Sequence, residues 1–382
     1  MKIVTAIDSF KGSLSTISTG NAAAEGIKCV YPDAEIIIRP LADGGEGTVR
    51  ALICEDTNHL HTVTVHNPLG EPVAAEYGIT EDGTAVIEMA AAAGITLINE
   101  NERNPLNTTT FGVGEIIKDA ISKNCRNFII GIGGSATNDG GLGMLQALGF
   151  DFLDENGNSV CFGAKGLEKL ASVSAANALP ELANCHFHVA CDVKNTLCGS
   201  EGCSAVFGPQ KGATPQMVAQ MDLWLQKFAD LTHKFTGKDY SKYPGAGAAG
   251  GLGFALISYL NASLEPGIDL IIRETRLEEY IKNADIVITG EGRLDDQTCM
   301  GKAPVGVADI AKKYDIPVIA FSGCVTDGAR LCNEHGIDAF FPILRTPCTL
   351  KAAMDCDNAY ANMKNSVEQV FRLIKTMESK KV

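Results

Sequence analysis

The sequence predicts an α/β fold with two domains. Near both chain ends, short apolar runs rich in Ile, Val or Phe alternate with helical stretches, which is typical of a parallel sheet covered by helices. In the middle of the chain, strands with alternating polar and apolar residues indicate antiparallel pairing. The length of 382 residues also exceeds what a single hydrophobic core usually serves.

The two chain ends are expected to build one domain around a Rossmann-like parallel sheet. Helical stretches in this domain include residues 16–30 and 305–314. Because its strands come from both ends of the chain, the domain is discontinuous and comprises residues 1–59 and 265–382. The expected strands are residues 3–7, 35–39, 285–289, 317–321 and 339–342.

The middle of the chain, residues 60–264, is expected to form an inserted mixed α/β domain with antiparallel hairpins. Asp82-Gly83 lies between two alternating runs, and this residue pair is a strong hairpin signal. The alternating runs are 62–65, 74–79 and 84–89, and buried strands are expected at 127–132 and 186–191.

The charge balance argues against nucleic acid or an anionic membrane as a partner. The chain has 46 acidic residues against 32 Lys and Arg, a formal net charge of −14, and no run of basic residues. No stretch approaches the roughly 20 apolar residues of a membrane helix, and Met1 leads into a strand rather than a signal peptide. We therefore expect a cytoplasmic protein.

The thirteen cysteines are expected to be reduced and packed. Their number is odd, and none of them forms a Cys-x-x-Cys pair. The seven histidines form no cluster that would complete a zinc site. Neither disulfides nor zinc are therefore expected.

Three turns rich in glycine and acidic residues directly follow apolar runs. They cover residues 8–12, 43–47 and 290–296. In open α/β sheets, ligands bind beyond the carboxyl ends of the strands. The turns would gather carboxylates, cations and free backbone N–H groups there. This mixture indicates an enzyme that handles phosphate.

A glycine-rich loop, residues 131–141, follows a predicted strand and leads into an apolar helix pattern. Glycines allow the backbone to approach a phosphate closely, and a helix N-terminus adds partial positive charge. Ser135 and Thr137 add hydroxyl groups. We expect this loop to hold phosphate groups.

A second glycine-rich loop, residues 244–251, contains the G-x-G-x-x-G spacing of dinucleotide sites. That fingerprint needs a strand directly before it, whereas residues 238–243 are polar and aromatic. The P-loop pattern is absent too, because neither Gly237-Lys238 nor Gly301-Lys302 is followed by Ser or Thr. A Walker-type site is therefore excluded, and a nucleotide-facing role for this loop stays open.

Phosphoryl transfer to a hydroxyl needs a phosphate cradle, a magnesium site, a general base and cations. Four aspartates closely follow apolar runs, so each can lie partly desolvated at the mouth of a strand. At least one of them should act as the base. They are Asp8, Asp43, Asp192 and Asp295.

The remaining parts of such a site have candidates in the same turns. Magnesium prefers carboxylates with retained water, which fits Asp43, Glu46 and Asp192. Lys11 and Arg293 are the cations; a lysine suits a phosphate, and the arginine fork suits a planar carboxylate. The residues thus indicate phosphoryl transfer and leave the acceptor open.

Six motifs resemble the bacterial glycerate kinase type 1 family, in the family's order and over essentially the whole chain. The resemblance implies ATP-dependent phosphorylation of D-glycerate with Mg²⁺, usually at the 2-hydroxyl. It also implies a two-domain α/β architecture with the active cleft between the domains. The motifs are residues 8–12, 40–47, 133–141, 190–193, 244–253 and 289–296.

With this resemblance, each candidate residue receives an expected role. The catalytic residues are expected to be Asp192, Lys11 and Asp8, with Asp192 as the leading candidate for the base. Glycerate is expected to contact Arg293, Asp295, Ser9 and Lys11. The metal is expected at Asp43 and Glu46. ATP is expected to contact Gly133, Gly134, Ser135, Thr137, Asn138, Asp139, Gly247 and Gly250.

Several alternatives stay open. The phosphate could go to the 3-hydroxyl, or the acceptor could be a related small hydroxy acid. A nicotinamide-dependent hydroxy-acid oxidoreductase would use the loop 244–253, and a non-catalytic ligand sensor would leave the clustered carboxylates without a purpose. Assembly into a homo-oligomer is left open as well.

Overall fold

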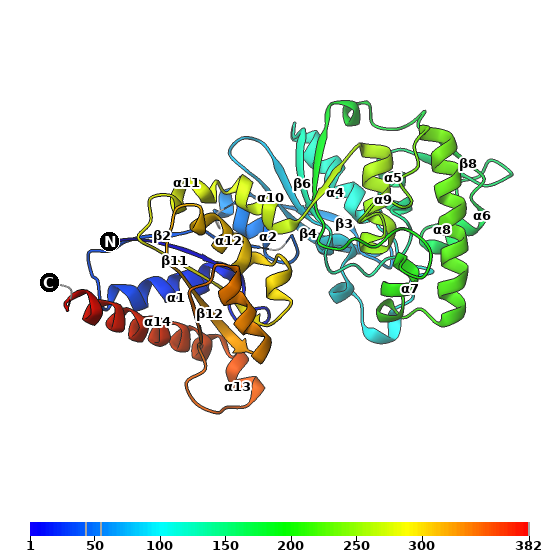
Figure 1. Ribbon diagram of the computed structural model, residues 1–382. Coiled ribbons are helices and arrows are strands. Elements are labelled where there is room, and N and C mark those ends of the chain that lie inside the picture. Colours follow the sequence, from blue (N-terminus) through cyan, green and yellow to red (C-terminus); the bar gives the residue numbers. More distant parts are fainter. Residues whose placement is uncertain (43, 54–55, 381–382) are drawn as a thin grey trace. The chain divides into compact units, whose positions relative to one another are not determined.

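A computed structural model describes residues 1–42, 44–53 and 56–380, and its contacts divide the chain into two compact units. The terminal unit contains Met1–Asp43, Arg50–Glu55 and Ile268–Val382. The inserted unit contains Gly44–Val49 and Asp56–Gly267. Each unit has its own sheet (Figure 1). Each unit also has its own hydrophobic core. The predicted α/β fold with two domains is confirmed.

The terminal unit is built on a five-stranded sheet in which every neighbouring pair is parallel, as predicted. Its strand order is β13-β12-β11-β1-β2, so strands from both chain ends lie side by side (Figure 1). The strands are β1 Lys2–Ile7, β2 Glu35–Ile38, β11 Ile286–Leu294, β12 Val318–Val325 and β13 Ala339–Pro342.

Helices cover both faces of this sheet because the strands are apolar on both sides. Along β1, Ile3 and Ile7 pack with α1 and α14, whereas Val4 and Ala6 pack with the helices on the opposite face. This alternation follows from the two-residue period of a strand. The helices are α1 Thr16–Lys28 and α14 Cys356–Glu378 on one face, and α10 Gly267–Glu274, α11 Leu277–Ile281 and α12 Ala303–Lys312 on the other.

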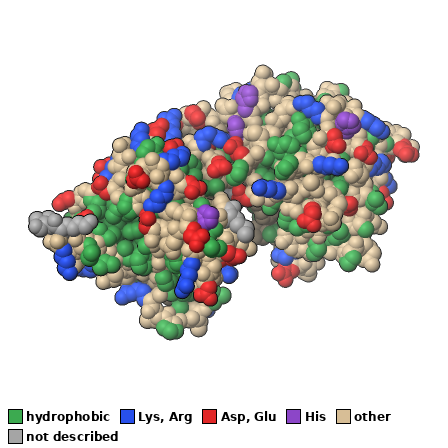
Figure 2. Space-filling model, viewed as in Figure 1, with side chains coloured by type: hydrophobic (Ala, Val, Ile, Leu, Met, Phe, Trp, Pro, Cys, Tyr) green, Lys and Arg blue, Asp and Glu red, His purple; other side chains and the backbone are tan. Residues whose placement is uncertain are grey.

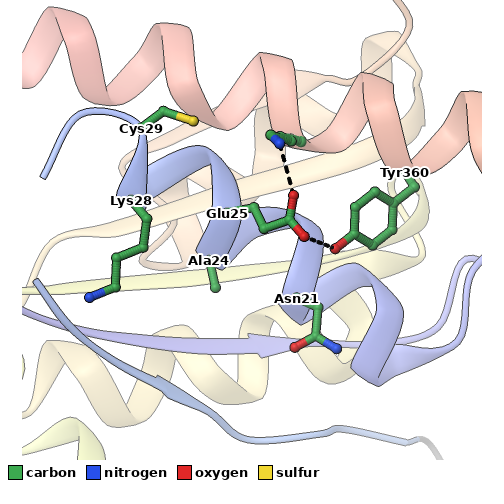
Figure 3. Close-up of a pocket in the computed structure, with 7 residues that line it drawn as sticks. Asn21, Ala24, Glu25, Lys28, Cys29 and Tyr360 are labelled. Atoms are coloured by element: carbon green, nitrogen blue, oxygen red, sulfur yellow. Dashed lines mark hydrogen bonds and ion pairs between the residues drawn. The ribbon is translucent and has the colours of Figure 1, made fainter. Parts of the chain in front are cut away.

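The contact between α1 and α14 joins the two ends of the chain. The Lys364 ammonium lies 2.8 Å from the Glu25 carboxylate, and the Tyr360 hydroxyl donates to the same group at 2.8 Å (Figure 3). These hydrogen bonds lower the pKa of Glu25, with Lys364 contributing most. Beside this ion pair, Gly26 is buried against the backbone of α14.

The inserted unit contains a six-stranded mixed sheet with the order β10-β9-β6-β5-β4-β3. The pairs β3·β4 and β4·β5 are antiparallel, which confirms the predicted hairpins, and the other pairs are parallel. Gly83 in the predicted turn has a φ of +81°, a left-handed conformation that glycine adopts easily. The strands are β3 Leu60–His66, β4 Pro72–Ile79, β5 Ala85–Glu88, β6 Asn127–Gly131, β9 His186–Ala190 and β10 Ser263–Glu265.

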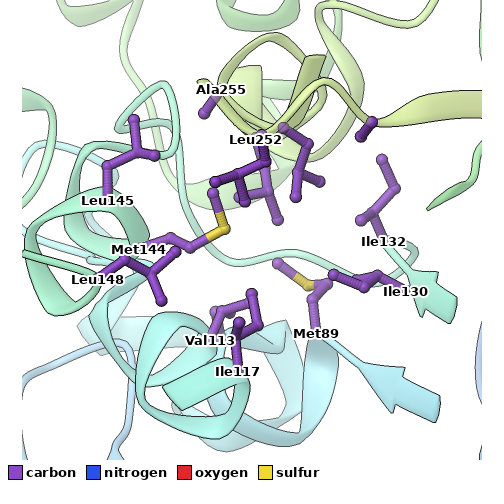
Figure 4. Close-up of a cluster of buried hydrophobic side chains, with 14 of the residues drawn as sticks. Met89, Val113, Ile117, Ile130, Ile132, Met144, Leu145, Leu148, Leu252 and Ala255 are labelled. Atoms are coloured by element: carbon purple, nitrogen blue, oxygen red, sulfur yellow. The ribbon is translucent and has the colours of Figure 1, made fainter. Parts of the chain in front are cut away.

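The core of the inserted unit lies between this sheet and a layer of helices. Met89, Val113, Met144 and Leu252 come from four separate segments and converge there (Figure 4). The longer helices are α4 Phe111–Ser122, α8 Pro215–Thr236 and α9 Ala248–Leu260. Shorter α-helices of this unit are α3 Ala90–Ala93, α5 Leu142–Ala147, α6 Ala164–Lys169 and α7 Cys203–Phe207. Helix α2 Thr48–Leu52 begins in the inserted unit and continues into the terminal unit, and α13 Leu350–Met354 belongs to the terminal unit.

Short 3₁₀ helices and one small hairpin complete the fold. The hairpin pairs β7 Asp151–Leu153 with β8 Ser172–Ser174 in antiparallel fashion. The 3₁₀ helices are η1 Thr57–His59, η2 Ile95–Leu97, η3 Glu100–Glu102, η4 Pro180–Asn184, η5 Pro209–Lys211, η6 Thr298–Met300 and η7 Asp327–His335.

Several segments differ from their prediction. Residues 290–294 are not a turn after a strand, because β11 continues through them and stays paired with β12 as far as Leu294 and Val325. Residues 44–49, 56–59 and 265–267 are expected in the terminal domain from the sequence but belong to the inserted unit. A β-carbon at Gly131 would lie 2.1 Å from the Gly44 carbonyl oxygen, so close backbone packing holds residues 44–49 to the inserted sheet.

Charged side chains of both signs are interspersed over the face of the protein that Figure 2 shows. All twelve cysteines that the structure describes are free thiols. Across residues 1–42, 44–53 and 56–380, no helix has both the length and the apolar character needed to cross a membrane.

Replacing Gly26 by alanine should destabilise the terminal unit. The added β-carbon would lie 2.4 Å from the Lys364 carbonyl oxygen and 3.1 Å from the Glu368 nitrogen, so α1 and α14 must move apart. Overpacking of this kind costs about 1–3 kcal/mol in the free energy of unfolding, although alanine favours helix. The exposed Asn21→Ala on the same helix is the control. Equal urea midpoints for the two variants would contradict this packing.

Candidate active site

The strand order of the terminal unit locates a ligand-binding edge. With its strands counted along the chain, the order β2-β1-β11-β12-β13 reads 2-1-3-4-5, a doubly wound topology. The direction of winding reverses between β1 and β11, and ligands in such sheets bind at the carboxyl ends of the strands at that point. Residues 8–12 follow β1 there, and residues 291–295 form the end of β11 and the turn after it.

A cavity of about 770 Å³ lies at this edge and is lined by five of the predicted site residues. They come from the segments after β1 and at the end of β11, which are separated by most of the sequence. The structure therefore brings together residues that the sequence analysis singled out independently. They are Asp8, Ser9, Lys11, Arg293 and Asp295.

The segment after β1 contributes a buried carboxylate to the lining of the cavity. Asp8 is 5% exposed, and its backbone N–H donates to the Gly290 carbonyl oxygen of β11 at 2.9 Å. One oxygen of the Asp8 carboxylate accepts a hydrogen bond from the Ser9 N–H at 2.7 Å. The backbone bond to β11 holds Asp8 beside the side chains of that strand.

Asp295 organises two cations at the edge of the cavity. Its carboxylate lies 3.3 Å from Arg293 Nε and 4.0 Å from Lys302 Nζ, and it accepts a hydrogen bond from the Gln297 N–H at 3.0 Å. Asp295 is buried, whereas Arg293 is mostly exposed. The carboxylate thus orients the guanidinium and leaves much of it open to an anion.

Glu291 lines the same cavity and had received no role from the sequence. Glu291 is partly buried, and its carboxylate accepts a hydrogen bond from the Thr298 hydroxyl at 2.5 Å. Burial raises the pKa of Glu291, while the Thr298 hydrogen bond and the Lys302 charge act in the opposite direction. The alternation Glu291, Arg293 along β11 is the signal that could have identified it, because alternate residues share one face of a strand.

The inserted unit contains the glycine-rich loop that was predicted to hold phosphate. Gly133 and Gly134 are exposed, and Ser135 is 9% exposed. The backbone N–H groups of these three residues donate to no acceptor within the part of the chain that the structure describes. This short segment therefore presents consecutive hydrogen-bond donors, as anion-binding loops do.

The rest of this loop is turned inward. Thr137, Asn138 and Asp139 are fully buried. The Asp139 carboxylate accepts hydrogen bonds from the backbone N–H groups of Thr110, Gly141 and Gly143 and from the Thr110 hydroxyl. The protein's own carboxylate thus occupies the N-terminus of α5. The expectation that this helix end attracts a phosphate is wrong for that reason.

A buried lysine that the sequence analysis did not single out supports the loop from within. Lys211 is 2% exposed, and its ammonium donates to the Ser135 hydroxyl oxygen at 2.6 Å and to the Thr137 carbonyl oxygen at 2.7 Å. Burial lowers the pKa of Lys211 to about 8. In the sequence Lys211 precedes Gly212, which is the reverse of the Gly-Lys order of a P-loop, so it matched no motif. Only the folded structure shows that Lys211 lies beneath the glycine-rich loop.

The second glycine-rich loop packs against the first. Gly247 and Gly250 are buried, and Gly250 accepts a hydrogen bond from the Gly140 N–H at 2.9 Å. A β-carbon at Gly250 would lie 2.0 Å from the Thr137 carbonyl oxygen, and one at Gly247 would lie 2.2 Å from that of Thr196. Close backbone contact accounts for both glycines. As expected, no strand precedes this loop.

The remaining predicted residues lie in the inserted unit or outside the described residues. Asp43 lies outside the described residues. Glu46 is exposed, and its charge contributes to the raised pKa of Glu88, whose largest cause is burial. Asp192 follows β9, and its carboxylate accepts a hydrogen bond from the Gly267 N–H at 2.8 Å. Among residues 1–42, 44–53 and 56–380, no three His, Cys, Asp or Glu side chains form a metal-binding group.

Comparison with known proteins decides the family. The sequence model of the glycerate kinase family matches residues 3–375. The chain belongs to the glycerate kinase family. It is therefore a kinase, a phosphotransferase with an alcohol as acceptor.

Similar proteins cover nearly the whole chain. A glycerate kinase from Haemophilus influenzae is 48% identical over 90% of this chain and 91% of its own length. A glycerate kinase from Bacillus subtilis is 46% identical over 99% of both chains, and a glycerate 2-kinase from Escherichia coli is 47% identical over 95% of both. A crystal structure from Salmonella typhimurium, named as a candidate glycerate kinase 2, superposes with a TM-score of 0.91 at 46% identity over 99% of both chains.

The buried ammonium of Lys211 should make stability depend on pH. In the unfolded chain the lysine keeps its proton up to about pH 10.5, whereas in the folded protein it loses the proton near pH 8. Between these values the unfolded state binds more protons, so stability rises with pH. From about pH 7.5 to about pH 9.5, the wild type should gain about 2 kcal/mol of unfolding free energy relative to Lys211→Met.

Urea unfolding of both proteins across this pH range measures the difference. Lys227→Met is the control, since Lys227 is exposed on α8 and shows no resolved pKa shift. Its pH profile should parallel that of the wild type. Parallel profiles for the wild type and Lys211→Met would contradict a depressed pKa at Lys211.

Proposed function

We propose that the protein transfers a phosphoryl group from ATP to the 2-hydroxyl of D-glycerate and forms 2-phosphoglycerate, with Mg²⁺ as the cofactor. Membership of the glycerate kinase family supports a small hydroxy acid as the substrate. The 2-hydroxyl as the acceptor is supported by the name of the Escherichia coli relative, glycerate 2-kinase.

The observation that carries this proposal is the cavity at the ends of β1 and β11. Glycerate is a small carboxylate with two hydroxyl groups, so its site needs a cation beside hydrogen-bonding groups. Arg293, held by Asp295, offers a guanidinium fork for the carboxylate. Asp8 and Ser9 lie on the same cavity wall and are proposed to bind the hydroxyl groups.

Lys11 is proposed to stabilise the transferring phosphoryl group as a point charge. Asp192 is proposed to accept the proton of the attacking hydroxyl, and Asp8 and Asp295 are the alternative carboxylates for that role. A base in this reaction must come within hydrogen-bond reach of the hydroxyl. Asp192 accepts a hydrogen bond from the Gly267 N–H at 2.8 Å, which orients its carboxylate.

The nucleotide phosphates are proposed to lie against Gly133, Gly134 and Ser135, the outward-facing part of the glycine-rich loop. Asp43 and Glu46 are proposed to hold Mg²⁺. Proteins commonly bind Mg²⁺ through one or two carboxylates together with phosphate oxygens and water, which the exposed carboxylate of Glu46 suits. When bound, Mg²⁺ neutralises negative charge on the phosphates.

The folded structure argues against the alternative of a nicotinamide-dependent oxidoreductase, because the glycines of its motif are not accessible. The glycines that would approach a dinucleotide, Gly247 and Gly250, are buried against backbone carbonyl groups of the same unit. The cavity residues are also those that phosphoryl transfer needs, since Lys11 and Arg293 lie beside Asp8 and Asp295. A kinase of glycerate remains the function that the site supports best.

The product identifies both the activity and the acceptor hydroxyl. The protein is incubated with ATP, Mg²⁺ and D-glycerate, and the product is examined by proton-coupled phosphorus NMR. A phosphate on the 2-hydroxyl couples to the single hydrogen of that carbon and should give a doublet, whereas a phosphate on the 3-hydroxyl would give a triplet. Removal of Mg²⁺ with EDTA should stop turnover.

A triplet would move the acceptor to the 3-hydroxyl and leave the kinase proposal in place. Turnover that survives EDTA would contradict the role of Mg²⁺. If no ester signal forms with D-glycerate, the proposed reaction is wrong.

Replacing Lys11 by methionine should reduce kcat/KM for glycerate by about 100-fold, because one cation beside the transferring phosphoryl group is lost. The side chain is exposed, so the fold should persist. Lys282→Met removes an exposed lysine elsewhere in the same unit and serves as the matched control. Near-normal turnover of Lys11→Met in a coupled ADP-release assay would remove Lys11 from the site.

A further inference from the structure

Lys211 is a buried cation whose hydrogen bonds all go to neutral oxygens. It ends η5, between α7 and α8, and its ammonium contacts the Ser135 hydroxyl and the Thr137 carbonyl group. Burying an ammonium without a paired anion is costly. Burial lowers the pKa of Lys211 and outweighs the opposing electrostatic effects of Cys203 and Asp139. The site therefore carries positive charge that the protein itself leaves largely uncompensated.

Lys211 determines which way the Ser135 hydroxyl can donate. An ammonium has only donors, so at the 2.6 Å contact Ser135 Oγ must be the acceptor. The hydroxyl hydrogen is then directed away from Lys211. No residue that the structure describes accepts this hydrogen, and Ser135, which is 9% exposed, follows two exposed glycines, so the hydroxyl can donate to a ligand bound at this loop.

Two backbone hydrogen bonds also fix the residues on either side of Ser135. The Gly134 carbonyl oxygen accepts from Ile95 N–H, and the Ala136 N–H donates to Ala93, both at 2.9 Å. These two bonds pin the loop to the segment after α3. They leave the N–H groups of Gly133, Gly134 and Ser135 without an acceptor among the described residues, with Gly134 at a φ of +74°.

We propose that Lys211 acts as a positioning residue that makes residues 133–135 a binding site for a tetrahedral oxyanion, with three backbone N–H groups and the Ser135 hydroxyl as donors. This inference rests on the proposed function insofar as the oxyanion is a phosphate group of the nucleotide. The buried charge of Lys211 acts through Ser135 and stabilises the bound anion. If Lys211 only held the loop in place, as a structural clamp, its hydrogen bonds to Ser135 and Thr137 would suffice and no anion would be involved.

If Lys211 positions an anion, anion binding should be accompanied by proton uptake, whereas a purely structural role for Lys211 predicts none. In the free protein the pKa of Lys211 is lowered to about 8 by burial, and a bound anion would raise it again. At about pH 8.5 a substantial share of the free molecules has neutral Lys211, so anion binding should take up a fraction of a proton. A clamp without anion contact would produce no proton uptake that depends on Lys211.

Isothermal titration calorimetry of the full-length protein with ATP and with inorganic phosphate tests the proposal. Titrations at about pH 8.5 in two buffers of different ionisation enthalpy report proton uptake. In Lys211→Met, affinity for both probes should fall by about 10- to 100-fold, the scale of a charge-assisted hydrogen bond, and the uptake should disappear. Lys211→Arg should recover part of the affinity, because it keeps the charge. Lys227→Met is the control for loss of a lysine in the same unit.

Ser135→Ala keeps Lys211 and guards against a folding defect in the lysine variants. It should weaken both probes by about 10-fold, because one donor is lost. Wild-type affinity and proton uptake in Lys211→Met would overturn the inference, and so would failure of the wild type to bind either probe. Lys211-dependent binding of inorganic phosphate without binding of ATP would support the oxyanion site and contradict the nucleotide in the proposed function.

Discussion

Parallel pairing of β1 with β11 is the constraint on which the candidate active site depends. Ile3 lies opposite Ile286 and Ile7 opposite Gly290, so strands from the two chain ends run side by side. Their carboxyl ends then share one edge of the sheet, where the winding reverses. This single register places the buried carboxylate of Asp8 beside the Glu291 and Arg293 face of β11. Loss of that pairing would separate the two walls of the cavity.

Glycine serves two different purposes in this protein. In the second glycine-rich loop, the absence of a side chain allows one backbone to touch another, as Gly250 does at Thr137. In the first loop, Gly133 and Gly134 leave backbone N–H groups exposed to solvent. The second loop thereby supports the shape of the first. Backbone contact and exposed N–H groups both require residues without a side chain, so the two loops look alike in the sequence.

Each unit contains an ionisable side chain whose charged form is disfavoured by burial, Glu291 on β11 and Lys211 at the end of η5. Glu291 in the terminal unit and Lys211 in the inserted unit both lie among groups that only partly compensate their charge, and burial shifts both pKa values toward the neutral form. Folding alone gains little from such groups, because desolvation of a charge is costly. For Lys211, the oxyanion proposed to bind at residues 133–135 would supply the missing partner.

The sequence by itself determined the α/β fold, the parallel and mixed sheets and the acidic glycine-rich motifs 8–12 and 290–296 as candidates for a site, because strand periodicity and such motifs are local properties; that β11 continues through residues 290–294 was decided by pairing with β12. Only the tertiary structure decided which loop residues face outward. Thr137, Asn138 and Asp139 share a motif with Gly133, yet Asp139 turns inward to bind the N-terminus of α5. The hydrogen-bond partners of Lys211 and the cavity around Glu291 were likewise decided by the tertiary structure. Burial and long-range hydrogen bonds depend on partners far apart in the chain, and no local pattern contains them.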